Sequence, residues 1–179
     1  MKKVILLAVL SFFSMVASAA SLSWSINGRS ILNPDGSGSK LSGALAYLVQ
    51  GTPTNDLVTA IKGGTWNPSS AFASGTSDGG GGATGSVENA AWAAGSTLDV
   101  YVIVFDGATI ANSNYFMVSS TASGILGNGG DVPGTAATWT AATVGEFTNG
   151  WQPLNVPEPT VLALLALGVA GLALRRKTA

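Results

Sequence analysis

The sequence predicts an all-β fold: an antiparallel β-sandwich lying between an N-terminal signal peptide and a single hydrophobic C-terminal helix. Short segments rich in β-branched and aromatic residues recur between turns rich in Gly, Ser and Asn, which is typical of antiparallel sandwiches. Helical periodicity is scarce between the two ends, and the long apolar runs lie at the termini. The pattern does not distinguish a jelly roll from an immunoglobulin-like sandwich.

Residues 1–19 have the pattern of a signal peptide. Lys2 and Lys3 precede a largely apolar stretch of 13 residues, 4–16, and small residues follow it. Ala17 and Ala19 occupy the positions of an Ala-x-Ala cleavage signal. The apolar stretch is shorter than the roughly 20 residues that a membrane-spanning helix needs. We therefore expect transfer through the Sec translocon and cleavage by signal peptidase after Ala19.

Residues 20–155 form the predicted exported domain, which is long enough to bury a core. The chain has no cysteine, so the core rather than disulfides must hold an exported fold together. Three cationic and eight acidic residues give this segment a net charge of −5. Because nucleic-acid binding requires a basic surface, we expect no nucleic-acid partner.

The strand predictions follow apolar alternation and β-branched runs. Residues 100–105 are apolar throughout, which predicts a central strand buried on both faces. The next segment, 114–119, is expected to pair with it as a hairpin. The complete set of predicted strands is Leu22–Ile26, Leu41–Gly51, Val100–Phe105, Asn114–Ser119 and, more weakly, Thr138–Phe147.

Helical signals are few inside the domain. Thr54–Gly64 could hold two turns, with Asn55 or Asp56 as the N-cap and a glycine pair at its end. Glu88–Ser96 is a second possible helix. The glycine-rich tract Gly75–Gly85 is expected to be a flexible loop between the two halves of the domain.

The C-terminal apolar run predicts a membrane segment. Thr160–Leu174 contains 15 residues without a charge, which as a helix would span about 22 Å. Local thinning of the bilayer would accommodate this length. The cations Arg175, Arg176 and Lys177 should stay on the cytoplasmic side of the inner membrane, which leaves the domain outside.

A proline pair precedes this run. Pro157 and Pro159 fix their own φ angles and bias Val156 and Glu158 towards extended backbone, which suits the active site of a processing enzyme. A Pro-Glu-Pro sequence, a short Leu/Ala/Gly helix and a terminal basic cluster stand in order within residues 156–179. This region resembles the PEP-CTERM sorting signal of Gram-negative bacteria.

The resemblance implies a route rather than an activity. It implies that a membrane-embedded exosortase recognises Pro157, Glu158 and Pro159 and cleaves near them. It also implies that the exported chain is then linked to the cell surface or to extracellular polysaccharide. We therefore expect membrane anchorage, transient or permanent, followed by a place at the cell surface or in the extracellular matrix. Its role there is expected to be non-enzymatic.

Two tryptophans are candidate sugar-stacking residues, which would make the domain a carbohydrate-binding module. Trp66 and Trp151 lie beside Pro and Asn in predicted loops, where an exposed ring could stack on a sugar. Trp24 and Trp139 lie in strand-like segments and are expected in the core. In the alternative interpretation, all the tryptophans fill the core.

No residue set predicts catalysis or a bound cofactor. The chain lacks histidine and cysteine, which removes the usual zinc sites and the Ser-His-Asp triad. Asp99 and Asp106 flank one strand at an odd spacing, so they should point to opposite faces about 23 Å apart. Asn33–Ser39 partly resembles a calcium loop, but Pro-Asp-Gly also predicts a simple turn.

Overall fold

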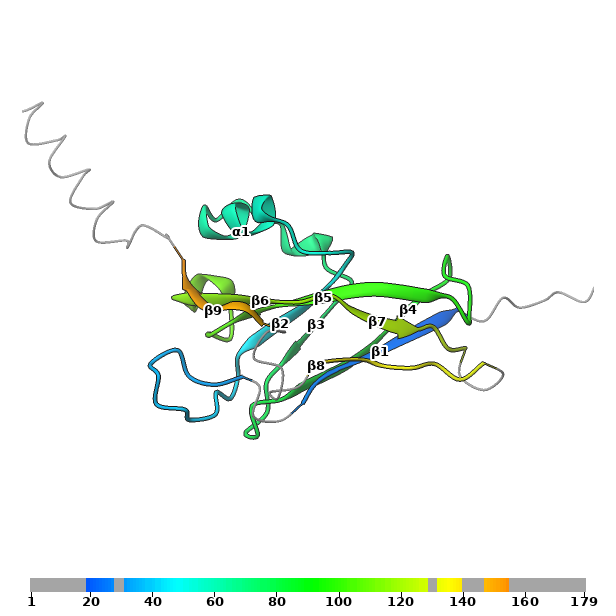
Figure 1. Ribbon diagram of the computed structural model, residues 1–179, viewed down its shortest axis with the longest axis horizontal. Coiled ribbons are helices and arrows are strands. Elements are labelled where there is room, and N and C mark those ends of the chain that lie inside the picture. Colours follow the sequence, from blue (N-terminus) through cyan, green and yellow to red (C-terminus); the bar gives the residue numbers. More distant parts are fainter. Residues whose placement is uncertain (1–18, 28–30, 129–131, 140–146, 155–179) are drawn as a thin grey trace, which may run out of the picture.

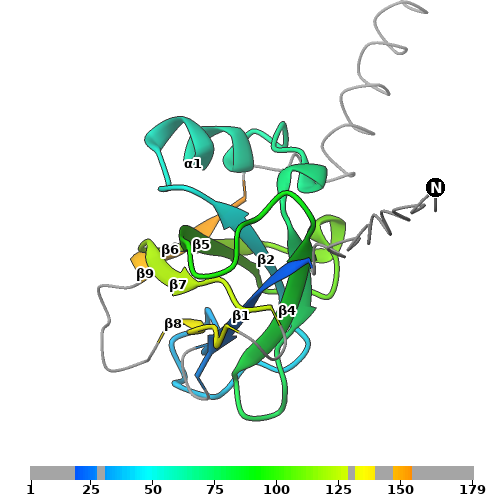
Figure 2. The same ribbon diagram turned by 90° about the vertical axis from the view of Figure 1, so that its right-hand side faces the viewer.

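The described part of the chain folds as a β-sandwich with helix α1 (Asn55–Lys62) on its outer side. The computed structural model describes residues 19–27, 31–128, 132–139 and 147–154. Figures 1 and 2 show three layers: helix α1, a larger sheet and a smaller sheet. The predicted all-β sandwich is confirmed. The predicted signal peptide, apart from Ala19, and the predicted C-terminal helix lie outside the described residues.

The larger sheet has six strands in the order β3-β2-β5-β6-β9, with β7 paired to the first half of β5. The smaller sheet has the order β4-β1-β8, in which β1 and β8 run parallel. The strands are β1 (Ala20–Ile26), β2 (Leu45–Gln50), β3 (Ala73–Thr76), β4 (Ala83–Asn89), β5 (Thr97–Phe105), β6 (Tyr115–Ser119), β7 (Ala122–Ile125), β8 (Ala137–Trp139) and β9 (Phe147–Pro153). Two short 3-10 helices are η1 (Pro68–Ser70) and η2 (Ile110–Asn112).

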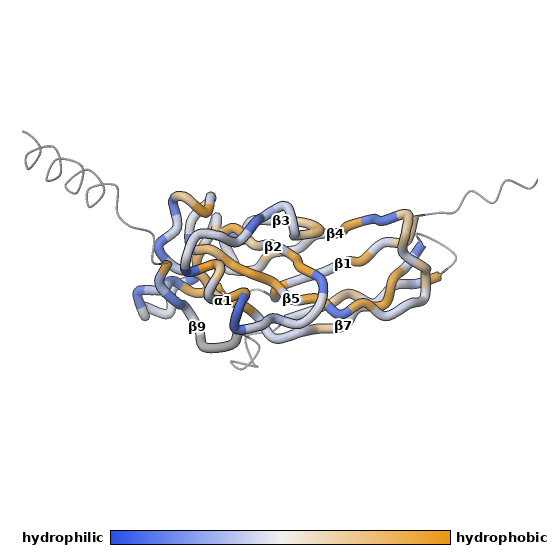
Figure 3. The backbone as a smooth tube through the Cα atoms, turned by 90° about the horizontal axis from the view of Figure 1, so that it is seen from above, coloured by the Kyte–Doolittle hydropathy of each residue, from blue (hydrophilic) through white to orange (hydrophobic). Residues whose placement is uncertain are grey.

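Strand β5 is the centre of the molecule, as predicted. Its side chains alternate between two apolar clusters because successive residues in a strand point to opposite faces. Val100, Val102 and Val104 face the core between the sheets. Tyr101, Ile103 and Phe105 face the second cluster, beneath α1. With both faces covered, the whole run is apolar, as the hydropathy colouring in Figure 3 shows for β5.

The core between the sheets takes alternate residues of β1. Ala20, Leu22, Trp24 and Ile26 are buried, whereas the serines between them are half-buried or exposed. Trp139 of β8 is also fully buried, and its Nε1 donates a hydrogen bond of 3.0 Å to the carbonyl of Ser120. The predictions of a strand at Leu22–Ile26 and of two core tryptophans are confirmed.

Helix α1 forms within the predicted segment, but its N-cap lies one residue before Asn55 and two before Asp56, the two predicted caps. Thr54 is the N-cap, and its hydroxyl accepts a hydrogen bond of 3.2 Å from the backbone N–H of Leu57. The predicted caps, Asn55 and Asp56, instead occupy the first turn. Ile61 anchors the helix in the cluster above β5.

Of two predictions about the segment between α1 and β5, one holds in part and one is wrong. Gly75–Gly85 is a loop between the two sheets only over residues 77–82, because Gly75 lies in β3 and Gly85 in β4. The turn between them is held by the Asp78 carboxylate, which accepts hydrogen bonds from the N–H groups of Gly80 and Gly82. Glu88–Ser96 is not a helix: it contains the end of β4 and the turns that lead to β5.

The other strand predictions hold in part. The hairpin of β5 with β6 is confirmed, with Phe105 opposite Phe116. The strand predicted at Leu41–Gly51 begins only at Leu45, since the preceding residues form bends. Thr138–Phe147 contains most of β8 and the first residue of β9, and the residues between them lie outside the described part of the chain.

Candidate functional site

The end of the sandwich where the chain leaves β9 carries the candidate sorting site. The last residue pair of the β6–β9 ladder is Tyr115 and Pro153. The next residue, Leu154, donates its N–H to the carbonyl of Asn114 at 2.9 Å and packs against the cluster beneath α1. Backbone hydrogen bonds therefore fix the chain as far as Leu154, the last described residue.

A carboxylate stabilises the turn at this same end. Asp106 Oδ1 accepts hydrogen bonds from the N–H groups of Asn114, at 2.8 Å, and Tyr115, at 2.9 Å. The Asp106 N–H donates in turn to the Tyr115 carbonyl at 3.1 Å. These bonds fix the start of β6, which pairs with the end of β9. The sequence predicted Asp106 at the end of a strand, but no local signal indicated its hydrogen bonds to Asn114 and Tyr115.

The predicted Pro-Glu-Pro motif begins three positions after Leu154. At the other end of the domain, Ala19 is half-buried and directly precedes β1, whose first residue, Ala20, is fully buried. The two ends therefore adjoin the first and last strands of the fold. The remaining predicted sorting residues lie outside the described part of the chain: Ala17, Pro157, Glu158, Pro159, Arg175, Arg176 and Lys177.

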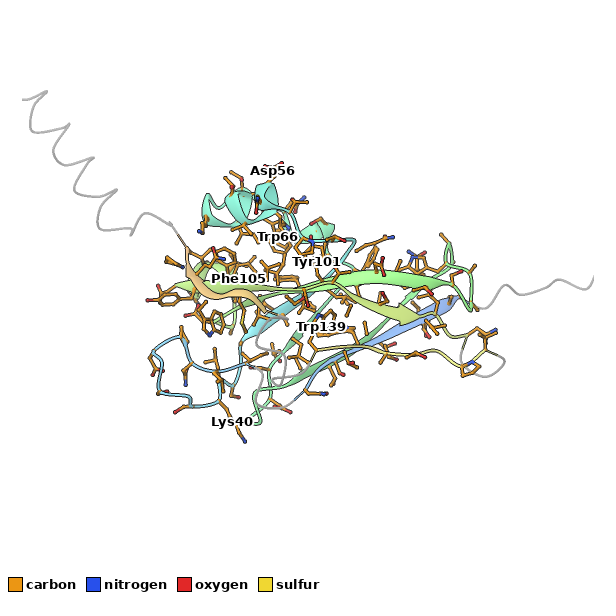
Figure 4. All side chains as sticks on the ribbon, in the orientation of Figure 1. Lys40, Asp56, Trp66, Tyr101, Phe105 and Trp139 are labelled. Carbon is orange, nitrogen blue, oxygen red and sulfur yellow. The ribbon has the colours of Figure 1, made fainter. Side chains whose placement is uncertain are left out.

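Trp66 lies in a loop, as predicted, between α1 and η1. Its ring stacks on Phe105 at a centroid distance of 6.0 Å and meets Tyr47 edge-on at 5.2 Å. Figure 4 shows Trp66, Tyr101 and Phe105 between α1 and the larger sheet. Burial in this cluster raises the pKa of the Tyr101 hydroxyl. Trp66 is half-buried and helps to pack α1 onto the sheet.

Trp151 does not lie in a loop, and this part of the prediction is wrong. It belongs to β9, is half-buried and packs against the core between the sheets. Its Nε1 donates a hydrogen bond of 2.8 Å to the carbonyl of Leu32. The neighbouring Pro153 suggested a loop, but proline is compatible with the end of an edge strand such as β9.

The segment Asn33–Ser39 forms a turn. The N–H of Asn33 bonds to the carbonyl of Ser39, and the Asp35 carboxylate accepts from the N–H of Ser37 at 2.9 Å. This hydrogen bond lowers the pKa of Asp35. No cluster of three acidic, histidine or cysteine side chains that could hold a metal occurs within the described residues.

Asp99 and Asp106 do not converge on one site. Asp99 lies in the first half of β5 and accepts a hydrogen bond of 2.5 Å from the Ser123 hydroxyl. Asp106 follows the last residue of the same strand and holds the turn described above. Within the described ranges, no helix is long and apolar enough to cross a membrane.

Comparison with known proteins identifies the tail. Residues 155–177 match the family model of the PEP-CTERM protein-sorting motif, which confirms the resemblance found in the sequence. The match begins at the residue after Leu154, where the described domain ends. No curated protein and no solved structure matches the chain.

Proposed function

We propose that the chain is an exported, non-enzymatic protein that an exosortase-type system sorts to the cell surface or extracellular matrix of a Gram-negative bacterium. The observation that carries the proposal is the PEP-CTERM motif at residues 155–177. In this role, the β-sandwich is the exported domain, and the tail is the sorting signal that the enzyme recognises.

The layout of the chain supports this division of labour. Leu154 ends the described domain, and the motif match starts at residue 155. The absence of histidine and cysteine from the sequence supports a non-enzymatic role, since most nucleophilic and metal-dependent chemistry uses those residues.

Intact mass tests the proposal. The protein is recovered from the envelope and from the medium of the native host, and each form is measured by mass spectrometry. A chain that starts near Ala20 and ends near Pro157–Pro159 is expected, and excess mass would report an attached glycan. A chain that still ends at Ala179 in both fractions would contradict sorting by cleavage.

The alternative role is that of a carbohydrate-binding module. It requires a tryptophan face that is free for a sugar ring, whereas Trp66 stacks on Phe105 and Trp151 bonds to Leu32. These contacts favour packing roles for both tryptophans. A panel of bacterial polysaccharides tests the point, because binding at either ring should change tryptophan fluorescence.

A further inference from the structure

The distance from the folded domain to the sorting motif is short. Three residue steps separate Leu154 from Pro157, and even a fully extended chain advances at most about 3.6 Å per step. The first motif residue can therefore lie no more than about 11 Å from Leu154. An enzyme that holds Pro157, Glu158 and Pro159 in an active site thus comes within contact range of the domain.

The domain does not release extra chain readily at this point. The β9 strand is paired with β6 as far as Pro153, and Leu154 continues the pairing through Asn114. Trp151 adds a side-chain bond to Leu32. Lengthening the connection by even a few residues means breaking these bonds. The enzyme therefore meets β9 in its paired state.

An aromatic side chain is exposed at this end. Tyr115 has 38 % of its surface exposed, and Pro153, directly opposite, is exposed as well. Opposite residues of an antiparallel pair share one face of the sheet, so the two form a single apolar patch beside the exit of the chain. Tyrosine is enriched in protein interfaces because its ring is apolar and its hydroxyl can hydrogen-bond.

We propose that Tyr115 and Pro153 form a docking surface for the exosortase that reads Pro157–Pro159. This inference rests on the proposed sorting function and extends it, since part of the recognition then lies in the folded domain. The short tether identifies the partner, because a protein that binds the motif is brought within reach of this patch. Contact between the exosortase and the domain then supplements recognition of the short motif, so the motif itself need not be longer.

Site-specific photocross-linking of the full chain tests the proposal in a host whose exosortase carries an epitope tag. The photoreactive residue p-benzoylphenylalanine replaces Tyr115 in one variant and Pro153 in a second. Ile125 is the matched control, because it is 39 % exposed but pairs with Thr97, at the opposite end of β5 from Phe105. Adducts with the tagged exosortase are expected from both test positions, and only at background level from Ile125.

A spacer separates docking from mere presence at the membrane. Inserting about eight Gly/Ser residues after Leu154 lengthens the tether from three steps to about eleven. The effective concentration of the motif-bound enzyme at the patch should then fall roughly sevenfold, following the −3/2 power of tether length. Cross-linking at Tyr115 is expected to fall by a similar factor if the tether brings the partners together.

A motif variant distinguishes failure of docking from failure of sorting. Changing Pro157, Glu158 and Pro159 to Ala should abolish processing, and normal processing of this variant would contradict the proposed function itself. If the motif variant is blocked, but Tyr115 and Pro153 give only lipid adducts or no more exosortase adduct than Ile125, the docking surface is overturned. A lipid adduct alone would assign the patch to the membrane surface.

Discussion

Gly85 lies directly against the indole of Trp24. A Cβ atom at Gly85 would stand 2.6 Å from Trp24 Nε1, and one at Gly75 would stand 3.2 Å from the far edge of the same ring. Trp24 belongs to β1 in the smaller sheet, whereas Gly75 belongs to β3 in the larger one. The two glycines therefore make room for a buried tryptophan where the sheets meet.

The first prediction concerns this contact. Gly85→Ala should lower the free energy of unfolding by about 1–3 kcal/mol, because an added methyl group in a close-packed core forces its neighbours to shift. Urea unfolding followed by tryptophan fluorescence measures the change. Gly79→Ala is the control in the same glycine tract, where a Cβ would meet nothing within 4 Å. Equal free energies of unfolding for the two variants would contradict the prediction, because they would show that Trp24 can move aside without loss of stability.

The second prediction concerns the end of β6, where β7 replaces β6 as the strand paired with β5. The buried Ser119 hydroxyl accepts from the N–H of Val102 at 2.9 Å and donates to the carbonyl of Ser120 at 2.7 Å. Ser119→Ala should cost about 1–3 kcal/mol of unfolding free energy, since it leaves a buried N–H without its partner. Ser23→Ala, at an exposed position of β1, should change the urea midpoint little. Matching midpoints would mean that Val102 finds another acceptor.

The third prediction concerns the start of α1. Thr54→Ala removes the hydroxyl that caps Leu57 and should destabilise the protein by about 1 kcal/mol. Thr59→Ala, on the exposed side of the same helix, should be neutral or slightly stabilising, because alanine has the higher helix propensity. Thermal unfolding of both variants makes the comparison. A Thr54→Ala variant as stable as wild type would show that the cap contributes nothing.

The fourth prediction concerns acid pH. Hydrogen bonds from the backbone N–H groups of Gly82 and then Gly80 lower the pKa of Asp78 below its ordinary 3.8. A depressed native pKa means that the charged carboxylate stabilises the fold above pH 3.8, and that this contribution is lost as the pH falls through the native value.

The measurement compares wild type with Asp78→Ala. The wild type should be the more stable above about pH 5, and the gap should close as the pH falls below about 4. Carbon NMR of the Asp78 carboxyl gives the native pKa directly. A titration midpoint at or above 3.8 would contradict the proposed role of the turn.

Local pattern was sufficient for some elements. All six residues of Val100–Phe105 are β-branched or aromatic. A fold that buries both faces of a sheet therefore places this run at its centre. The alternation from Leu22 to Ile26 likewise determines which side chains of β1 face the core. The C-terminal motif could be identified without the fold, because its residue pattern alone matches the family model.

The tertiary structure decided what depends on partners distant in the sequence. Trp151 is in a strand because β9 pairs with β6, and Gly85 is a core position because Trp24 of another strand requires the space. The exposure of Tyr115 beside the exit of the chain depends on the same pairing. By itself, the sequence determined the sheet character, the buried faces of β1 and β5 and the sorting motif, since these depend on neighbouring residues. Strand pairing and close packing depend on contacts across the fold, so only the tertiary structure decided them.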